Sequence, residues 1–201
     1  MSEEVDTGLW DELRLVSLLK KREEEAFRVL MQRYEKKVFG IAYGITLDRE
    51  ESRDIVQEVF VKVYESIDTF RGESKLSTWL HRITVNLCLN WKRRWKRRFR
   101  WQHEPIDSKE TSQRADAEGK DRRPDVIYEK KELEQVFWQS LRKIPETARA
   151  VFVLKEVEGL SYDEIAQTLN IRKGTVSSRL YYARRKLKDA LRAHEREKGG
   201  L

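Results

Sequence analysis

Apolar side chains recur at intervals of three or four residues along most of the chain, which is the period of one face of an α-helix. Within residues 10–45 the pattern is carried by Leu13, Val16, Leu19, Phe27, Leu30, Tyr34, Val38, Ile41 and Ala42. After Asp48 and Glu51, which can form a capping box, it continues through Ile55, Val56, Val59, Phe60, Val63, Tyr64 and Ile67. Alternation typical of strands is scarce, so the sequence predicts an all-α fold.

Two interruptions divide this helical pattern. A glycine-containing break at residues 70–74 precedes a further helix, which is predicted to run from about Ser77 to near Trp101. Residues 102–125 contain few apolar side chains and are typical of a flexible linker. The pattern resumes near Val126 and ends near His194. The sequence therefore predicts two small helical domains, residues 1–101 and 126–201, joined by that linker.

The second predicted domain carries the signals of a helix-turn-helix motif. Pro145 suits the first turn of a helix, and Gly159 is a natural cap for the end of that helix. Residues 161–164, Ser-Tyr-Asp-Glu, form a capping box for a short helix, and residues 170–172 suit a tight turn. The next helix is predicted to begin at about Lys173.

Opposite faces of the helix that begins at Lys173 differ in chemistry. One face is apolar and holds Val176, Leu180, Ala183, Leu187 and Leu191. The other holds Gly174, Ser178, Tyr181, Tyr182 and Arg185, flanked by Arg172, Thr175 and Arg179. Small residues permit a close approach of the backbone, and hydroxyl and guanidinium groups bond phosphates and base edges. This face suits a DNA major groove, with an ordinary solvated helix pair as the alternative.

Charge and composition narrow the classes of function. The formal net charge of +7 favours a polyanionic partner, nucleic acid first. Because Cys88 is the single cysteine, no intramolecular disulfide or cysteine-rich zinc site can form, and we expect a buried small apolar residue there. No apolar run approaches the ~20 residues that cross a bilayer, and the acidic N-terminus is unlike a signal peptide. We therefore expect a cytoplasmic protein without membrane insertion.

Signatures of catalysis do not stand out in the sequence. The three histidines, His81, His103 and His194, are scattered. We find no glycine-rich phosphate loop, Ser/His/Asp set or carboxylate pair. We therefore expect no catalytic residues, no cofactor, no metal and no small-molecule substrate.

Three blocks of sequence resemble one known family, the sigma-70 family of RNA polymerase sigma factors. Residues 54–64, DIVQEVFVKVY, resemble the polymerase-binding helix of sigma region 2. Residues 68–74 and 78–86 resemble the loop and helix that melt and read the −10 element of a promoter. Residues 159–166, GLSYDEIA, and the segment 174–179 resemble region 4, which reads the −35 element. The order of the blocks, without a substantial region 3, resembles the extracytoplasmic-function group.

The resemblance implies a specificity subunit of core RNA polymerase that contacts the β and β′ subunits and promoter DNA. The implied polymerase-binding residues are Asp54, Gln57, Glu58, Phe60 and Lys62. The implied −10 residues are Phe70, Arg71, Gly72, Glu73, Ser74, Lys75, Trp79, Arg82, Asn86, Asn90, Arg93 and Arg94. The implied −35 residues are Arg172, Lys173, Gly174, Thr175, Ser177, Ser178, Arg179, Tyr181, Tyr182 and Arg185.

A basic and aromatic stretch at residues 91–101 has two interpretations. Trp91, Trp95 and Phe99 lie one helical turn apart among seven positive charges. We favour contact between the charges and the DNA backbone, with Trp91 packed against the core, while Trp95 and Trp101 receive no assignment. Trp79 fits core packing and the edge of a DNA duplex equally well.

Two other functions compete with the sigma interpretation. A stand-alone helix-turn-helix regulator would bind its operator as a dimer, although the N-terminal block shows no ligand-pocket pattern. An RNA-binding or helicase-like enzyme would use the basic and aromatic stretch, but needs a nucleotide site that the sequence does not show. By resemblance to the family, we also expect an anti-sigma partner and a role in an envelope or stress response.

Overall fold

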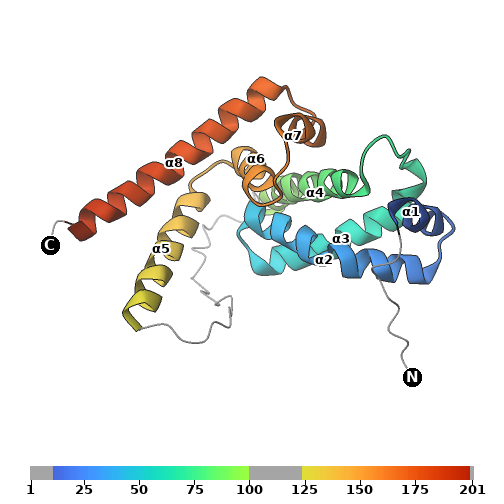
Figure 1. Ribbon diagram of the computed structural model, residues 1–201, viewed down its shortest axis with the longest axis horizontal. Helices are drawn as coiled ribbons and strands as arrows, with labels where there is room; N and C mark the ends of the chain where they lie inside the picture. The colour runs from blue at the N-terminus through green and yellow to red at the C-terminus, as the bar shows by residue number, and fades with distance from the viewer. Residues whose placement is uncertain (1–10, 100–123, 200–201) are drawn as a thin grey trace.

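The computed structural model describes residues 11–99 and 124–199, and every regular element in them is helical (Figure 1). The first part contains α1 (Glu12–Lys20), α2 (Glu24–Thr46), α3 (Arg49–Ser66), the 3-10 helix η1 (Ile67–Thr69) and α4 (Leu76–Phe99). The second contains α5 (Pro124–Arg142), α6 (Glu146–Glu156), α7 (Tyr162–Leu169) and α8 (Lys173–Gly199). The all-α prediction is confirmed, while most of the predicted linker lies outside the described residues.

A turn divides the first helical pattern into α1 and α2, which the spacing of apolar residues does not predict. Arg22 adopts the left-handed conformation, with φ of 63°, and its N–H bonds the carbonyl of Leu19 at 3.0 Å. No glycine, proline or asparagine marks this turn, so the sequence carries none of the usual signals. Leu13 belongs to the pattern but is 82% exposed, because it lies on the outer side of α1.

Helices α2, α3 and α4 pack on one another and enclose the core of the N-terminal part. The half of the predicted capping box that Asp48 supplies is present at the start of α3, since Asp48 Oδ1 accepts the Glu51 N–H at 2.9 Å. The apolar face of α3 is buried apart from Tyr64, which is 51% exposed. Its ring packs against Phe27, with 4.9 Å between centroids.

The helix-turn-helix motif forms as predicted from α7 and α8. Ser161 donates its N–H to Glu164 Oε2 at 2.8 Å, and Glu164 donates its N–H to Ser161 Oγ at 3.2 Å, so the capping box is complete. Asn170 makes the turn in the left-handed conformation, with φ of 50°. The end of α6 differs from the prediction. The helix stops at Glu156, and Gly159, with φ of 69°, lies in the turn that follows.

The two described parts of the chain share one core. Helix α6 packs on α2 and α4, and α7 packs on α4, while α5 and α8 pack on each other farther out (Figure 1). The shared core includes Val151, Val153 and Ile165, which lie in contact with the cluster formed by the N-terminal helices. At Gly44 the backbone of α2 lies so close to the side chain of Val153 in α6 that an added Cβ would be 2.7 Å from Val153 Cγ2.

Candidate nucleic-acid interface

Helix α4 presents a row of polar side chains on the face opposite its buried one. Arg82, Asn86 and Asn90 are spaced four residues apart and are all exposed. The buried face holds Val85 and Cys88, so Cys88 is the buried small residue that the sequence predicts. Burial raises the pKa of the Cys88 thiol far above its ordinary value, which keeps this group protonated and unreactive.

The loop before α4 continues this polar row. Residues 71–75 are all exposed, and Gly72 takes the left-handed conformation, with φ of 75° and open space around its α-carbon. Together with Arg82, Asn86 and Asn90, these residues form what we call the α4 surface. Its members combine a flexible backbone position with cationic, hydroxyl and amide groups, which can bond phosphates and base edges.

Two aromatic residues predicted for the −10 site lie in the core instead of on the α4 surface. Phe70 is 5% and Trp79 is 6% exposed, and their rings pack together with 5.4 Å between centroids. Of the two interpretations that the sequence left open for Trp79, the structure therefore favours packing in the core. Trp91 also packs against the core, as predicted. Arg93, Arg94 and Trp95 lie on the α4 backbone with their side chains outside the described part, and Trp101 lies beyond it.

The predicted polymerase-binding residues occupy α3. Asp54, Gln57 and Lys62 are exposed, and Glu58 is half-buried. Lys62 Nζ pairs with Glu65 Oε2 at 2.9 Å on the same helix. Phe60 differs from the other four, because its side chain is 7% exposed and belongs to the core.

Helix α8 presents a second polar face, which we call the α8 surface. It is formed by Arg172, Lys173, Gly174, Thr175, Ser177, Ser178, Arg179, Tyr181 and Arg185, of which Thr175 and Arg179 are half-buried. Tyr181 is 66% exposed, and the Arg185 guanidinium lies 5.9 Å from the centre of its ring. Tyr182, also predicted for this site, is half-buried and packs against the apolar cluster that includes Leu141 and Leu187.

An apolar groove lies between α5, α6 and α8. Phe137, Phe152, Leu187 and Leu191 supply its apolar lining, and its volume is about 530 Å³. Charged residues complete the lining, among them Glu156 and Arg184, whose Oε1 and Nη2 atoms lie 2.6 Å apart. The sequence analysis did not identify this groove, because its residues come from three helices and only the fold brings them together.

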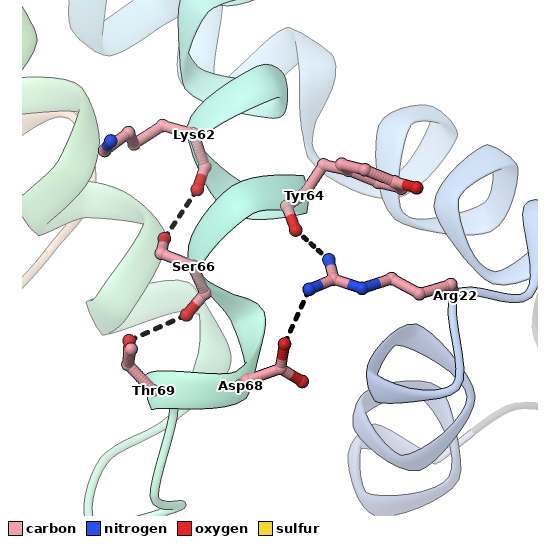
Figure 2. A network of polar contacts seen from close by, with 6 residues as sticks. All are labelled: Arg22, Lys62, Tyr64, Ser66, Asp68 and Thr69. Carbon is pink, nitrogen blue, oxygen red and sulfur yellow. Dashed lines mark hydrogen bonds and ion pairs between the residues drawn. The ribbon is translucent and has the colours of Figure 1, made fainter.

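Two residues of the N-terminal segment hold the ends of the loop at residues 70–75, and sequence reasoning missed both. Glu12 Oε1 accepts the N–H of Leu76, the first residue of α4, at 2.8 Å. Arg22 Nη2 lies 2.6 Å from Asp68 Oδ2 in η1, and Nη1 donates to the carbonyl of Tyr64 (Figure 2). These contacts join residues 42 to 64 positions apart, so no local pattern could have indicated them.

A buried histidine lies where the two parts of the chain meet. His81 of α4 is 4% exposed, and its Nε2 lies 3.5 Å from Oε2 of Glu158, in the turn after α6. Burial, and secondarily the charge of Lys37, lowers the pKa of His81 from 6.5 to about 4. Burial also raises the pKa of the Glu158 carboxyl. At neutral pH His81 is therefore neutral.

Neither a metal site nor a membrane span is found in the described part of the chain. Residues 11–99 and 124–199 contain no group of three or more histidine, cysteine or acidic side chains that could hold a metal ion. In the same ranges no helix combines the length and the apolar character needed to cross a bilayer.

Each of the two described parts of the chain matches a known protein family. Residues 30–98 match the family described as sigma-70 region 2, and residues 134–187 match sigma-70 region 4. The RNA polymerase sigma-H factor of Pseudomonas aeruginosa is 34% identical over 190 residues, covering 92% of this chain and 95% of that protein. The ECF RNA polymerase sigma-E factor of Escherichia coli K12 is 34% identical over 170 residues, covering 85% and 88%.

Two solved structures share the fold. CnrH, solved in complex with the cytosolic domain of CnrY, has a TM-score of 0.64 and 24% identity, covering 90% of this chain and 97% of that one. The sigma factor RpoE of Bartonella quintana, solved with the anti-sigma factor NepR, has a TM-score of 0.64 and 22% identity, covering 83% and 96%. With the matches in sequence, these findings show that the chain belongs to the extracytoplasmic-function group of the sigma-70 family, whose members are specificity factors of transcription.

Proposed function

We propose that this protein brings core RNA polymerase to promoters through two separate DNA contacts, one on the α4 surface and one on the α8 surface. The observation that carries the proposal is that both polar surfaces are exposed in one fold while the apolar faces behind them are buried. The chain supplies binding and no chemistry of its own, so it acts as a non-catalytic subunit in the cytoplasm.

The α8 surface is the proposed reader of the −35 element. Helix α8 begins at Lys173, and the exposed Gly174 has open space around it, so this end of the helix can approach DNA closely. Its amide groups favour phosphate. Hydroxyl and guanidinium groups farther along can reach base edges in the major groove. Arg172 and Ser178 are the residues we expect to contribute most.

The α4 surface is the proposed reader of the melted −10 element. A base displaced from a duplex needs room for close approach and hydrogen-bonding groups for its edge. Gly72 and the polar residues around it supply both, and Asn86 extends the contact along α4. Because Phe70 is buried, its ring would stack on a base only after the loop moved.

Two further surfaces are proposed to bind polymerase. The exposed residues Asp54, Gln57 and Lys62 of α3 form a polar face suited to the β′ clamp helices. The apolar groove between α5, α6 and α8 suits an apolar segment of the β flap, which would bury Phe137 and Leu191. By resemblance to the family, an anti-sigma protein restrains the factor until an envelope or stress signal releases it.

In vitro transcription tests the proposal directly. Bacterial core polymerase is assayed with and without the protein on a pool of genomic promoter fragments. New transcripts that require the protein, and that share two sequence elements upstream of their start sites, support it. Duplex binding by the protein alone, without new transcripts, would instead support a stand-alone regulator.

A further inference from the structure

The loop at residues 70–75 forms one end of the α4 surface and is weakly braced over its exposed part. Residues 71–75 are exposed, and the hydrogen bond that the Ser74 hydroxyl donates to the carbonyl of Lys75 is long, at 3.4 Å. The glycine at position 72 adds backbone freedom. The conformation of such a loop therefore depends on how firmly its two ends are held.

Arg22 holds the end at which the loop begins. Its guanidinium donates to the Tyr64 carbonyl, in the last turn of α3, where backbone carbonyls lack helical partners. The same group pairs with Asp68 at 2.6 Å and lies 4.8 Å from the centre of the Tyr64 ring. A cation placed there also complements the helix dipole. Figure 2 shows these contacts meeting on one guanidinium.

Two more hydrogen bonds lie between the guanidinium of Arg22 and the start of the loop, in the turn from α3 into η1. Ser66 Oγ donates to the carbonyl of Lys62 at 2.5 Å, and Thr69 Oγ1 donates to the carbonyl of Ser66 at 2.7 Å (Figure 2). Thr69 is the residue before Phe70, where the loop starts. The turn from α3 through η1 is therefore fixed on both sides of Asp68.

Glu12 holds the end at which the loop stops. Its carboxylate accepts the N–H of Leu76, an amide at the N-terminus of α4 that has no partner within the helix. Leu76 itself is fully buried. An acidic group at a helix N-terminus is favoured by the dipole as well as by the hydrogen bond.

Helix α1 connects these two anchors. Glu12 is its first residue, Arg22 follows its end by two positions, and Leu15 and Leu19 between them are fully buried. Helix α1 also packs on η1. One short helix, with its apolar face in the core, thus spans both ends of the loop.

We propose that α1 sets the conformation of the loop at residues 70–75, and that Arg22 and Glu12 are positioning residues for recognition of the −10 element. The inference rests on the proposed function of the α4 surface. Neither residue needs to touch DNA. Arg22 requires its planar group, because a lysine cannot reach two acceptors in the same geometry.

The test measures discrimination at the −10 element with reconstituted holoenzyme. Transcription from a promoter found in the pool is compared with transcription from the same promoter carrying a substituted −10 element. The variants are Arg22→Ala, Arg22→Lys, Asp68→Asn and Glu12→Gln. The matched control is Arg28→Ala, because Arg28 also forms ion pairs, at 2.8 and 3.0 Å, with Glu25 and Glu24 of its own helix α2.

We expect Arg22→Ala to lower the ratio of matched to substituted transcription about tenfold, the factor that corresponds to 1.4 kcal/mol. Asp68→Asn and Glu12→Gln should also lower this ratio. Arg22→Lys should give a ratio between those of Arg22→Ala and the unmodified protein. Affinity for core polymerase, measured by competition, should stay unchanged in every variant. Arg28→Ala should behave as the unmodified protein does.

Two outcomes would overturn the inference, and they are distinct from failure of the proposed function. Equal loss on matched and substituted promoters would give the anchors a purely structural role. An unchanged ratio in all four variants, with Asn86→Ala still lowering it, would show that the loop needs no bracing. If Asn86→Ala also left the ratio unchanged, the assignment of the α4 surface would itself be wrong.

Discussion

Individual side chains on the two polar surfaces have different expected effects, because their neighbours differ. Asn86 and Ser178 are exposed, and neither belongs to the apolar core. Phe70 and Trp79 were predicted for the −10 element and Phe60 for polymerase binding, but all three are buried, so their substitution would disturb folding as well as binding. Clean tests of function therefore use the exposed polar residues.

Asn86→Ala should weaken recognition of the −10 element. The amide of Asn86 can donate and accept, and the loss of such a base contact costs about 1–3 kcal/mol. We expect transcription from a matched promoter to fall, while competition for core polymerase is unaffected. The control is Gln32→Ala, which removes an exposed side-chain amide from α2, away from the α4 surface. Normal transcription by Asn86→Ala would contradict the assignment.

Arg172→Ala and Ser178→Ala should weaken use of the −35 element. If Arg172 binds phosphate, its loss should reduce binding on all promoters and lower the slope of log affinity against log salt by about one. If Ser178 reads a base edge, its loss should depend on the −35 sequence instead. Binding of holoenzyme to promoter fragments, titrated at several salt concentrations, separates these effects. If both variants kept the affinity and the salt slope of the unmodified protein, Arg172 and Ser178 would not contact the −35 element.

At the level of elements, hydrogen bonds at helix ends explain both the successes and the misses of the sequence analysis. The caps at Asp48 and Ser161 were predictable because their partners lie three residues away. The turn at Arg22 was not, since what supports its left-handed backbone is a contact with Tyr64 and Asp68, over 40 residues away. The apolar groove was also not predictable, because its lining residues come from three helices that are separate in the sequence.

Ser161→Ala should destabilise α7 by about 1 kcal/mol, as the loss of an N-cap does. Denaturant unfolding measures this, with Ser177→Ala as the control for removing an exposed hydroxyl. Hydrogen bonds from Ser161 lower the pKa of the Glu164 carboxyl below 4.5. The stability from this carboxylate is present above pH 4.5 and is lost as the pH falls through the lowered pKa. An equal effect of both serine variants would argue against the cap.

At the level of the whole molecule, the two parts of the chain pack through a core that the sequence did not predict. Each part has its own helical pattern, and the sequence analysis assigns the residues of α6 to the second of two domains joined by a linker. The structure places Val153 against Gly44 and His81 beside Glu158. Arg82, Asn86 and Asn90 remain exposed in this arrangement, so the contact between the parts leaves the α4 surface open.

Gly44→Ala tests this packing, with a control on the same helix. A methyl group at position 44 would lie 2.7 Å from Val153 Cγ2, and such overpacking costs about 1–3 kcal/mol. At Gly40 nothing lies within 4 Å, so Gly40→Ala should stabilise α2 by about 0.5–1 kcal/mol. Adding Val153→Ala to Gly44→Ala should recover part of the loss. Equal unfolding free energies for the two glycine variants would show that the parts do not pack this way.

The lowered pKa of His81 predicts how the free energy of unfolding depends on pH. Its pKa is lowered from 6.5 to about 4, so the folded protein binds a proton at this site less readily than the unfolded chain. The free energy of unfolding should therefore be constant above pH 6.5 with respect to this group and should fall as the pH drops toward 4. The full difference amounts to about 3 kcal/mol. Glu158 has the opposite sign, because its raised pKa makes burial less costly in acid, and it offsets part of the loss.

Unfolding by denaturant between pH 7 and pH 5 tests this prediction. Because the raised pKa of Glu158 also affects the profile, the contribution of the histidine is the difference between the unmodified protein and the variant His81→Leu. Of the charged groups nearby, Lys37 lowers the pKa of the imidazole, whereas Glu164 raises it. His81→Leu removes two buried nitrogens that have no hydrogen-bond partner, so it should flatten the pH dependence without a large loss at pH 7. If the free energy of unfolding changed with pH as steeply in His81→Leu as in the unmodified protein, His81 would not be the group that titrates.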